Sequence, residues 1–128
     1  MLTVRRVLYF AIAMTLLFDL LAAIAGRVSG FHYGWRGPGS ALIYTIAAYI
    51  VGRIANLKVA TLVAASAAAA DATLGWAIAW AIGPGRLPIE SRDLPLFVGI
   101  VIGITLTGAL LGVVGGLLGR LRSQHAAG

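Results

Sequence analysis

The stretch AASAAAADATLGWAIAWAIGPG, residues 64–85, decides the fold class. It is built almost wholly of small and apolar residues, yet it carries one acid, Asp71. Its apolar run supplies most of a membrane-spanning helix, which takes about 20 residues. The ending Gly83-Pro84-Gly85 is typical of a helix terminus, because glycine can cap a helix and proline cannot continue it. An acid in the middle of such a helix needs compensation from elsewhere in the chain.

The composition predicts an integral membrane protein. Of the 128 residues, 60% are hydrophobic and only 11% are charged, and the mean hydropathy is +0.96. A soluble domain carries about 25% charged residues. The length leaves no room for a separate soluble module beside several spans, so we expect one transmembrane domain over residues 1–128.

Polar residues, glycines and prolines divide the chain into four apolar segments. We expect all-α structure, a four-helix bundle, with helices at about residues 7–25, 40–54, 59–82 and 94–118. The segments exceed the length of a tilted membrane strand and lack its alternation. Ser40 and Asp93 are the expected N-caps of the second and fourth helices. A cleaved signal sequence is the less favoured interpretation of the first segment, because the apolar run is long and Asp19 interrupts it.

The basic residues favour an orientation with both termini inside. Four spans place both termini on one side, which would collect six basic residues against four on the other. The inner set is Arg5, Arg6, Arg53, Lys58, Arg120 and Arg122, and the outer set is Arg27, Arg36, Arg86 and Arg92. In this arrangement Trp35, Trp76 and Trp80 cluster near the outer interface, where amphipathic rings serve as anchors. We therefore expect a multi-pass protein of a bacterial inner membrane.

Two acids are expected at one depth in the bundle. Asp19 lies twelve positions beyond residue 7 and Asp71 twelve beyond residue 59, so at about 1.5 Å per residue each is roughly 18 Å deep. Neither should face lipid, because a carboxylate at mid-helix costs about 2.5–3.5 kcal/mol. The expected intramembrane polar site combines these acids with hydroxyl groups at similar levels. The hydroxyl residues are Thr15, Tyr44, Thr45, Thr105 and Thr107.

No basic residue occupies the middle of an expected helix. Arg27 lies eight residues beyond Asp19 and can reach partway back, whereas Arg36, Arg86 and Arg92 can enter only from the loops. Two interpretations of the acid pair remain. In the first, the carboxyl groups fix helix packing or bind a partner subunit. In the second, they mark a proton or cation path, the default hypothesis for ionisable residues in a span.

Small residues recur at four-residue spacing, a pattern called a glycine zipper. Gly75 lies four residues beyond Asp71, and the fourth segment repeats the spacing along its length. Such spacing allows two helix backbones to approach closely. The neighbour can be another helix of the chain, a second copy, or another protein. The helix-packing residues of the fourth segment are Gly99, Gly103, Gly108, Gly112, Gly115, Gly116 and Gly119.

The two halves of the chain share a pattern that indicates two helical hairpins. Each half carries an acid in its first helix and ends with Gly-Arg, at Gly52-Arg53 and Gly119-Arg120. Parallel halves of this kind are related by a pseudo-twofold axis along the membrane normal.

Catalysis is not expected. The chain has no cysteine and two histidines, so we expect no metal site and no cofactor, and we identify no nucleophile or substrate clamp beside the acids. The net charge of +6 is spread singly or in pairs at helix ends, which favours membrane anchoring over nucleic-acid binding.

In layout, four short spans with an acid in the first resemble the small multidrug exporters, whose membrane glutamate exchanges protons for cationic drugs as a dimer. Here the acid is Asp19, a second acid occurs at Asp71, and the surrounding residues do not follow that family's motif. The fluoride channels are similar in size and glycine content, but their pore-lining Asn and Phe pattern is not apparent. We therefore expect a helix-packing or accessory subunit of a membrane complex, associated with lipid and with its own copies or other membrane subunits. The alternative is a small oligomeric proton- or cation-coupled transporter or channel that uses Asp19 and Asp71.

Overall fold

The structure is a computed structural model that describes residues 1–30, 32–83 and 94–126, and these ranges contain helices and no strand. The predicted all-α fold of four helices is confirmed. Its elements are α1 (Val4–Ser29), the 3-10 turn η1 (Tyr33–Trp35), α2 (Arg36–Ile54), α3 (Leu57–Ala70), η2 (Asp71–Gly75), α4 (Trp76–Ile82) and α5 (Leu94–Ala126). Elements α3, η2 and α4 follow one another without a break and form the third of the four helices.

Local signals account for several helix ends. The Thr3 hydroxyl accepts a hydrogen bond from the Arg6 N–H at the start of α1. Asn56 caps α3 in the same way through the Val59 N–H. These side chains satisfy N–H groups that have no partner within the helix. Gly30 ends α1 in the left-handed conformation, with φ of 68°, which glycine adopts without steric cost.

Helix α2 begins earlier than predicted. The expected N-cap, Ser40, is buried inside the helix, which starts at Arg36. The sequence Gly37-Pro38-Gly39 lies within the first turn, where Pro38 is tolerated because the first N–H groups of a helix need no intrahelical acceptor. This correction brings Arg36 from an expected loop onto the helix. The other expected N-cap, Asp93, lies outside the described residues.

The third helix contains one π-helical turn, η2, which begins at Asp71 and ends at Gly75. Such a turn widens the helix locally and changes the direction in which side chains project. Single π turns within α-helices occur frequently at functional sites. This turn contains Asp71, the predicted intramembrane acid, and Gly75, a predicted helix-packing residue.

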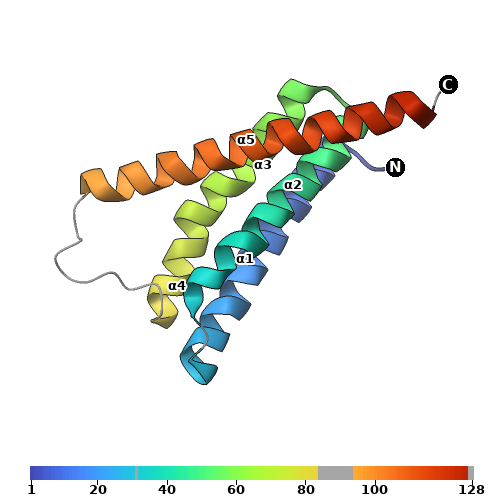
Figure 1. Cartoon of the computed structure of the whole chain (residues 1–128). Coiled ribbons are helices and arrows are strands. Elements are labelled where there is room, and N and C mark those ends of the chain that lie inside the picture. The colour runs from blue at the N-terminus through green and yellow to red at the C-terminus, as the bar shows by residue number, and fades with distance from the viewer. Residues whose placement is uncertain (31, 84–93, 127–128) are drawn as a thin grey trace.

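Figure 1 shows α1, α2 and the third helix side by side, with α5 inclined across them and both termini at one end. α5 packs on α2 and α3 through its later turns, and its first turns extend past them, where Phe97 contacts Trp76 of α4 (Figure 1). Most buried side chains are small, and Ala23, Ala48, Ala60 and Ala64 are fully covered. Large apolar side chains instead lie on the outside, including Phe10 and Leu110.

Three of the helices are long and apolar enough to cross a membrane. They are Val4–Ser29, Leu57–Ile82 and Leu94–His125. Within the part of the chain that the structure describes, α2 does not meet the same criteria. It carries Arg36 and Arg53 near its two ends and packs against α1, α3 and α5.

Candidate functional site

The two acids of the sequence meet in the interior through one arginine. Nη1 of Arg36 lies 2.6 Å from Oδ1 of Asp19 and 2.6 Å from Oδ1 of Asp71. Asp19 comes from α1, Asp71 from η2 and Arg36 from the first turn of α2. Asp19 and Asp71 are 0% and 3% exposed. One guanidinium therefore joins three helices, and charge-assisted hydrogen bonds of this kind are stronger than neutral ones.

Tyr44 completes the cluster. Its buried hydroxyl donates a hydrogen bond to Oδ2 of Asp71. Tyr44 lies eight positions beyond Arg36 on α2, so the two residues are about two turns apart on one face. Asp71 thus receives hydrogen bonds on both carboxylate oxygens from the same helix. We call Asp19, Arg36, Tyr44 and Asp71 the acid–arginine cluster.

Gly75 makes room for the Asp19 carboxyl group. A Cβ atom built on Gly75 would lie 1.8 Å from Oδ2 of Asp19 and 3.0 Å from Oδ1 of Asp71. The carboxyl of Asp19 therefore lies directly against the backbone of the π turn. Within the described ranges, no N–H or O–H group donates to Oδ2 of Asp19, although this oxygen is buried.

The cluster contains two carboxyl groups and one guanidinium. If both carboxyls are ionised, the cluster carries an excess negative charge in an interior where isolated charges are costly. A single proton or a bound cation would balance it. The arrangement can therefore either fasten the three helices together or hold one exchangeable positive charge.

The predicted threonine partners do not bind the acids in this structure. Each donates a hydrogen bond to the carbonyl four residues earlier in its own helix. The pairs are Thr15 to Ala11, Thr45 to Ala41, Thr105 to Val101 and Thr107 to Gly103. A threonine hydroxyl is short, so the carbonyl one turn back is its nearest acceptor. Of the predicted hydroxyl partners, Tyr44 is the one whose side chain is long enough to reach a carboxyl.

Sequence reasoning named Arg36 only as one of four arginines near the acids. Arg27, the nearest in sequence to Asp19, instead donates a hydrogen bond to the carbonyl of Ile82 at 2.9 Å. Arg86 and Arg92 lie outside the described residues. The Gly-Pro-Gly sequence after Arg36 is typical of a loop, so the sequence predicts that this arginine precedes the helix, whereas the structure places it in the first turn of α2.

The glycines of α5 fall into three groups. Gly108, Gly112 and Gly116 lie against Ala68, Ala64 and Ala60 of α3. Gly115 and Gly119 lie against backbone carbonyls of α2, those of Thr45 and Tyr49. In contrast, no described atom lies within 4 Å of a Cβ built on Gly99 or Gly103. The glycines at four-residue spacing therefore pack against other helices of the chain only in the later turns of α5, from Gly108 onward.

Gly52 is a packing residue that the sequence interpretation missed. A Cβ on Gly52 would lie 2.4 Å from the carbonyl oxygen of Gly116, so α2 and α5 cross with their backbones in contact here. From the sequence, Gly52 is predicted to end the first half of the chain, and it is not among the predicted helix-packing residues. The repeated Gly-Arg pattern at Gly52 and Gly119 was a signal for such a crossing, because both glycines lie on this contact.

The tryptophans lie near one end of the described structure. Trp76 packs on Phe97 of α5, with ring centroids 5.0 Å apart. Trp35 and Trp80 are largely exposed. A small recess of about 30 Å³ beside Arg36 is lined partly by Trp76 and Phe97, and it has room for about one water molecule.

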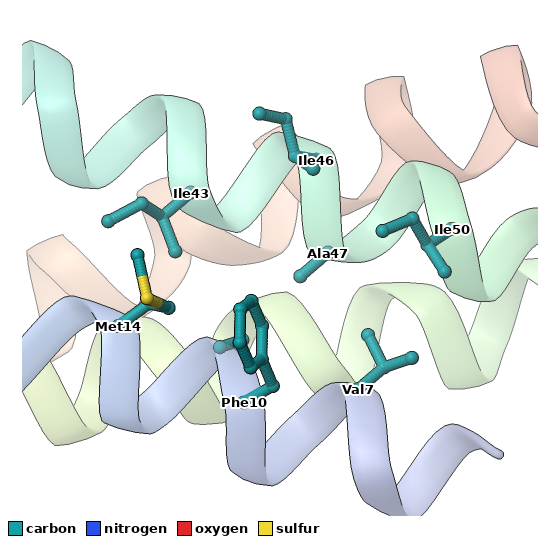
Figure 2. A pocket seen from close by; sticks show the side chains of 8 residues that line it. Val7, Phe10, Met14, Ile43, Ile46, Ala47 and Ile50 are labelled. Carbon is teal, nitrogen blue, oxygen red and sulfur yellow. The ribbon is translucent and has the colours of Figure 1, made fainter. Parts of the chain in front are cut away.

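A second concavity is wholly apolar, lies between α1 and α2 (Figure 2), and has no residue of the cluster in its lining. For metals, no group of three His, Cys, Asp or Glu side chains that could hold an ion occurs in the described ranges. No known protein family, curated protein or solved structure matches this chain. The function must therefore be argued from the site itself.

Proposed function

We propose that the chain is a multi-pass integral protein of a bacterial inner membrane. Its three long apolar helices support this, as does the placement of large apolar side chains on the outer surface around an alanine-rich interior. The buried charges are concentrated in the acid–arginine cluster, where they contact one another. The excess of basic residues at the expected inner ends supports an orientation with both termini inside.

Its location and orientation can be tested with single cysteines, because the chain contains none of its own. Ser29→Cys and Ser123→Cys lie at opposite expected sides of the membrane, and both residues lie near helix ends. A membrane-impermeant thiol reagent applied to intact spheroplasts should label only the first. Labelling of only the second would reverse the orientation, and extraction of the protein by alkaline carbonate without detergent would contradict membrane insertion.

Within the membrane, the geometry is best explained by a helix-packing or accessory subunit without catalytic activity. The observation that carries this role is the exposed face of the first turns of α5, on the side that does not contact Trp76. Leu94, Leu96 and Val98 are exposed there, and a Cβ atom built on Gly99 or Gly103 would meet no described atom of another element within 4 Å. The same glycine spacing forms close helix contacts further along α5, so a helix of another subunit or of a second copy fits here.

The acid–arginine cluster supports this role because it fixes how the helices of the bundle pack against one another. It joins α1, α2 and η2, and α5 packs against α2 and α3. Removing either partner of a buried ion pair is strongly destabilising. The cluster would thereby keep the bundle in one geometry, while the exposed face of the first turns of α5 stays available to a partner helix.

The role is tested by isolating the tagged protein in mild detergent and identifying what accompanies it in stoichiometric amount. Gly99→Leu combined with Gly103→Leu should release the associated subunit or copy, because leucine side chains prevent close backbone approach. Ala13→Leu is the matched control, since Ala13 is an exposed small residue on α1. A parent protein that migrates as a monomer with no companion would contradict the subunit role.

A second candidate, a proton- or cation-coupled transporter or channel, is favoured by one observation. Two carboxyls share one guanidinium beside a recess of about 30 Å³, and Oδ2 of Asp19 is buried with no described donor. Asp19→Asn and Asp71→Asn, each reconstituted in liposomes, distinguish the candidates. Transport predicts that proton or cation flux disappears while assembly persists. Loss of assembly in the variants, together with no flux through the parent protein, favours the helix-packing role.

A further inference from the structure

The groove between α1 and α2 is lined wholly by apolar side chains and has a volume of about 160 Å³. Figure 2 shows Val7, Phe10 and Met14 of α1 on one side and residues of α2 on the other. Ala11 and Ala47 are 2% and 6% exposed and form its floor, whereas Phe10 and Ile46 are 68% and 49% exposed and form its rims. The groove therefore opens toward the surroundings of the bundle.

Two arginines stand at one end of this groove. Arg6 lies four positions before Phe10 on α1, and Arg53 lies seven positions after Ile46 on α2. Residues at these spacings share a helix face, so each arginine continues one rim of the groove. Because α1 and α2 run in opposite directions (Figure 1), both arginines belong to the end that carries Val7 and Ile50.

Both guanidinium groups are exposed. Nη1 of Arg6 donates to the carbonyl of Met1, and the group keeps further N–H donors. The carboxylates within the described ranges, Asp19 and Asp71, are both bonded to Arg36. Within the described ranges, neither carboxylate forms an ion pair with Arg6 or Arg53, which stand at one end of the apolar groove.

We propose that this groove binds one anionic phospholipid, with an acyl chain between α1 and α2 and the phosphate between Arg6 and Arg53. The proposal rests on the membrane location proposed above. An acyl chain matches the apolar lining, and arginine binds phosphate through paired N–H groups. The expected inner orientation of Arg6 and Arg53 also places them at the leaflet surface, where anionic lipids attract basic residues.

The test is lipid retention by the full chain, measured by native mass spectrometry after partial delipidation. The probes are dipalmitoyl phosphatidylglycerol and dipalmitoyl phosphatidylcholine, which differ in headgroup charge. Phosphatidylglycerol should be retained preferentially by the parent protein. Arg6→Gln with Arg53→Gln should weaken its retention roughly twenty-five-fold, since each basic residue near an anionic surface contributes about fivefold.

The matched charge control is Arg120→Gln with Arg122→Gln, which removes two exposed arginines from α5. Retention should persist in this control. Equal loss in both pairs would overturn the proposal, because it would show diffuse attraction to anionic lipid. Circular dichroism and the elution volume of each variant confirm that the fold is retained.

A second arm tests the groove itself. Ile46→Trp should fill it and abolish retention, whereas Leu110→Trp, at an exposed position on α5, should not. If Ile46→Trp leaves lipid retention unchanged, or instead dissociates a dimer, the groove does not hold the acyl chain and the proposal is wrong. Failure of the membrane location is distinguishable, because such a protein would leave the membrane fraction without detergent.

Discussion

Gly75 and Asp19 are in direct contact across two helices: a Cβ atom on Gly75 would lie 1.8 Å from Oδ2 of Asp19. The missing side chain is thus what allows the carboxyl to lie against the π turn. Asp19 cannot move aside freely, because it is fully buried and its other oxygen is bonded to Arg36.

Gly75→Ala should therefore destabilise the protein by about 1–3 kcal/mol, the usual range for inserting an atom into a packed interior. The measurement is thermal unfolding in detergent, followed by tryptophan fluorescence. Gly103→Ala is the control, since no described residue lies near that position and alanine favours helix over glycine. Equal effects of the two substitutions would show that Gly75 does not contact Asp19.

Arg36→Gln should be among the most damaging single substitutions in the bundle. It leaves Asp19 and Asp71 buried without their shared cation, and breaking a buried ion pair costs about 3–5 kcal/mol. Arg27→Gln should cost much less, because Arg27 is exposed and donates to a backbone carbonyl. Unfolding in detergent compares the two variants.

Part of the stability should return when the acids are neutralised as well. Asp19→Asn and Asp71→Asn, introduced together into the Arg36→Gln protein, remove the uncompensated charges. The triple variant should unfold at a higher temperature than Arg36→Gln alone. A triple variant less stable than the single one would mean that Arg36 acts through contacts other than the two carboxyls.

Tyr44→Phe should destabilise the protein by about 1–3 kcal/mol. It removes a buried donor to Asp71 and leaves a carboxylate oxygen without that hydrogen bond, while the ring is kept. Tyr9→Phe is the matched control, because the Tyr9 hydroxyl accepts an exposed hydrogen bond from Arg5. The difference between the two unfolding temperatures measures the buried hydrogen bond.

Gly52→Ala should separate α5 from α2. A Cβ there would lie 2.4 Å from the carbonyl oxygen of Gly116, and a backbone atom cannot swing away as a flexible side chain can. Thermal unfolding in detergent, followed by tryptophan fluorescence, should therefore occur at a lower temperature in Gly52→Ala than in the parent protein. Gly99→Ala should leave the unfolding temperature nearly unchanged, because a Cβ there would meet no described atom within 4 Å, and an equal loss with that control would contradict the contact at Gly52.

Much of the fold followed from patterns local to each helix. Apolar length predicted the helices, and Asp19 and Asp71 were expected at one depth because each lies equally far along its segment. The structure brings both to one nitrogen of Arg36. Tyr44 was also predicted as a hydroxyl partner, and it reaches Asp71 from the interior face of α2.

The remaining features depend on how the helices are rotated and tilted against one another. The choice of Arg36 over Arg27 and the division of the α5 glycines between α2 and α3 both vary with small shifts in helix position.

By itself, the sequence determined that the chain forms long apolar helices, that two acids lie within them, and that small residues line some helix faces, because these properties depend on composition and spacing along one segment. Only the tertiary structure decided which cation meets the acids, where the π turn falls, and which glycines touch another backbone. Those outcomes arise from contacts at a few ångströms between segments far apart in the chain, and no periodicity within one helix specifies them.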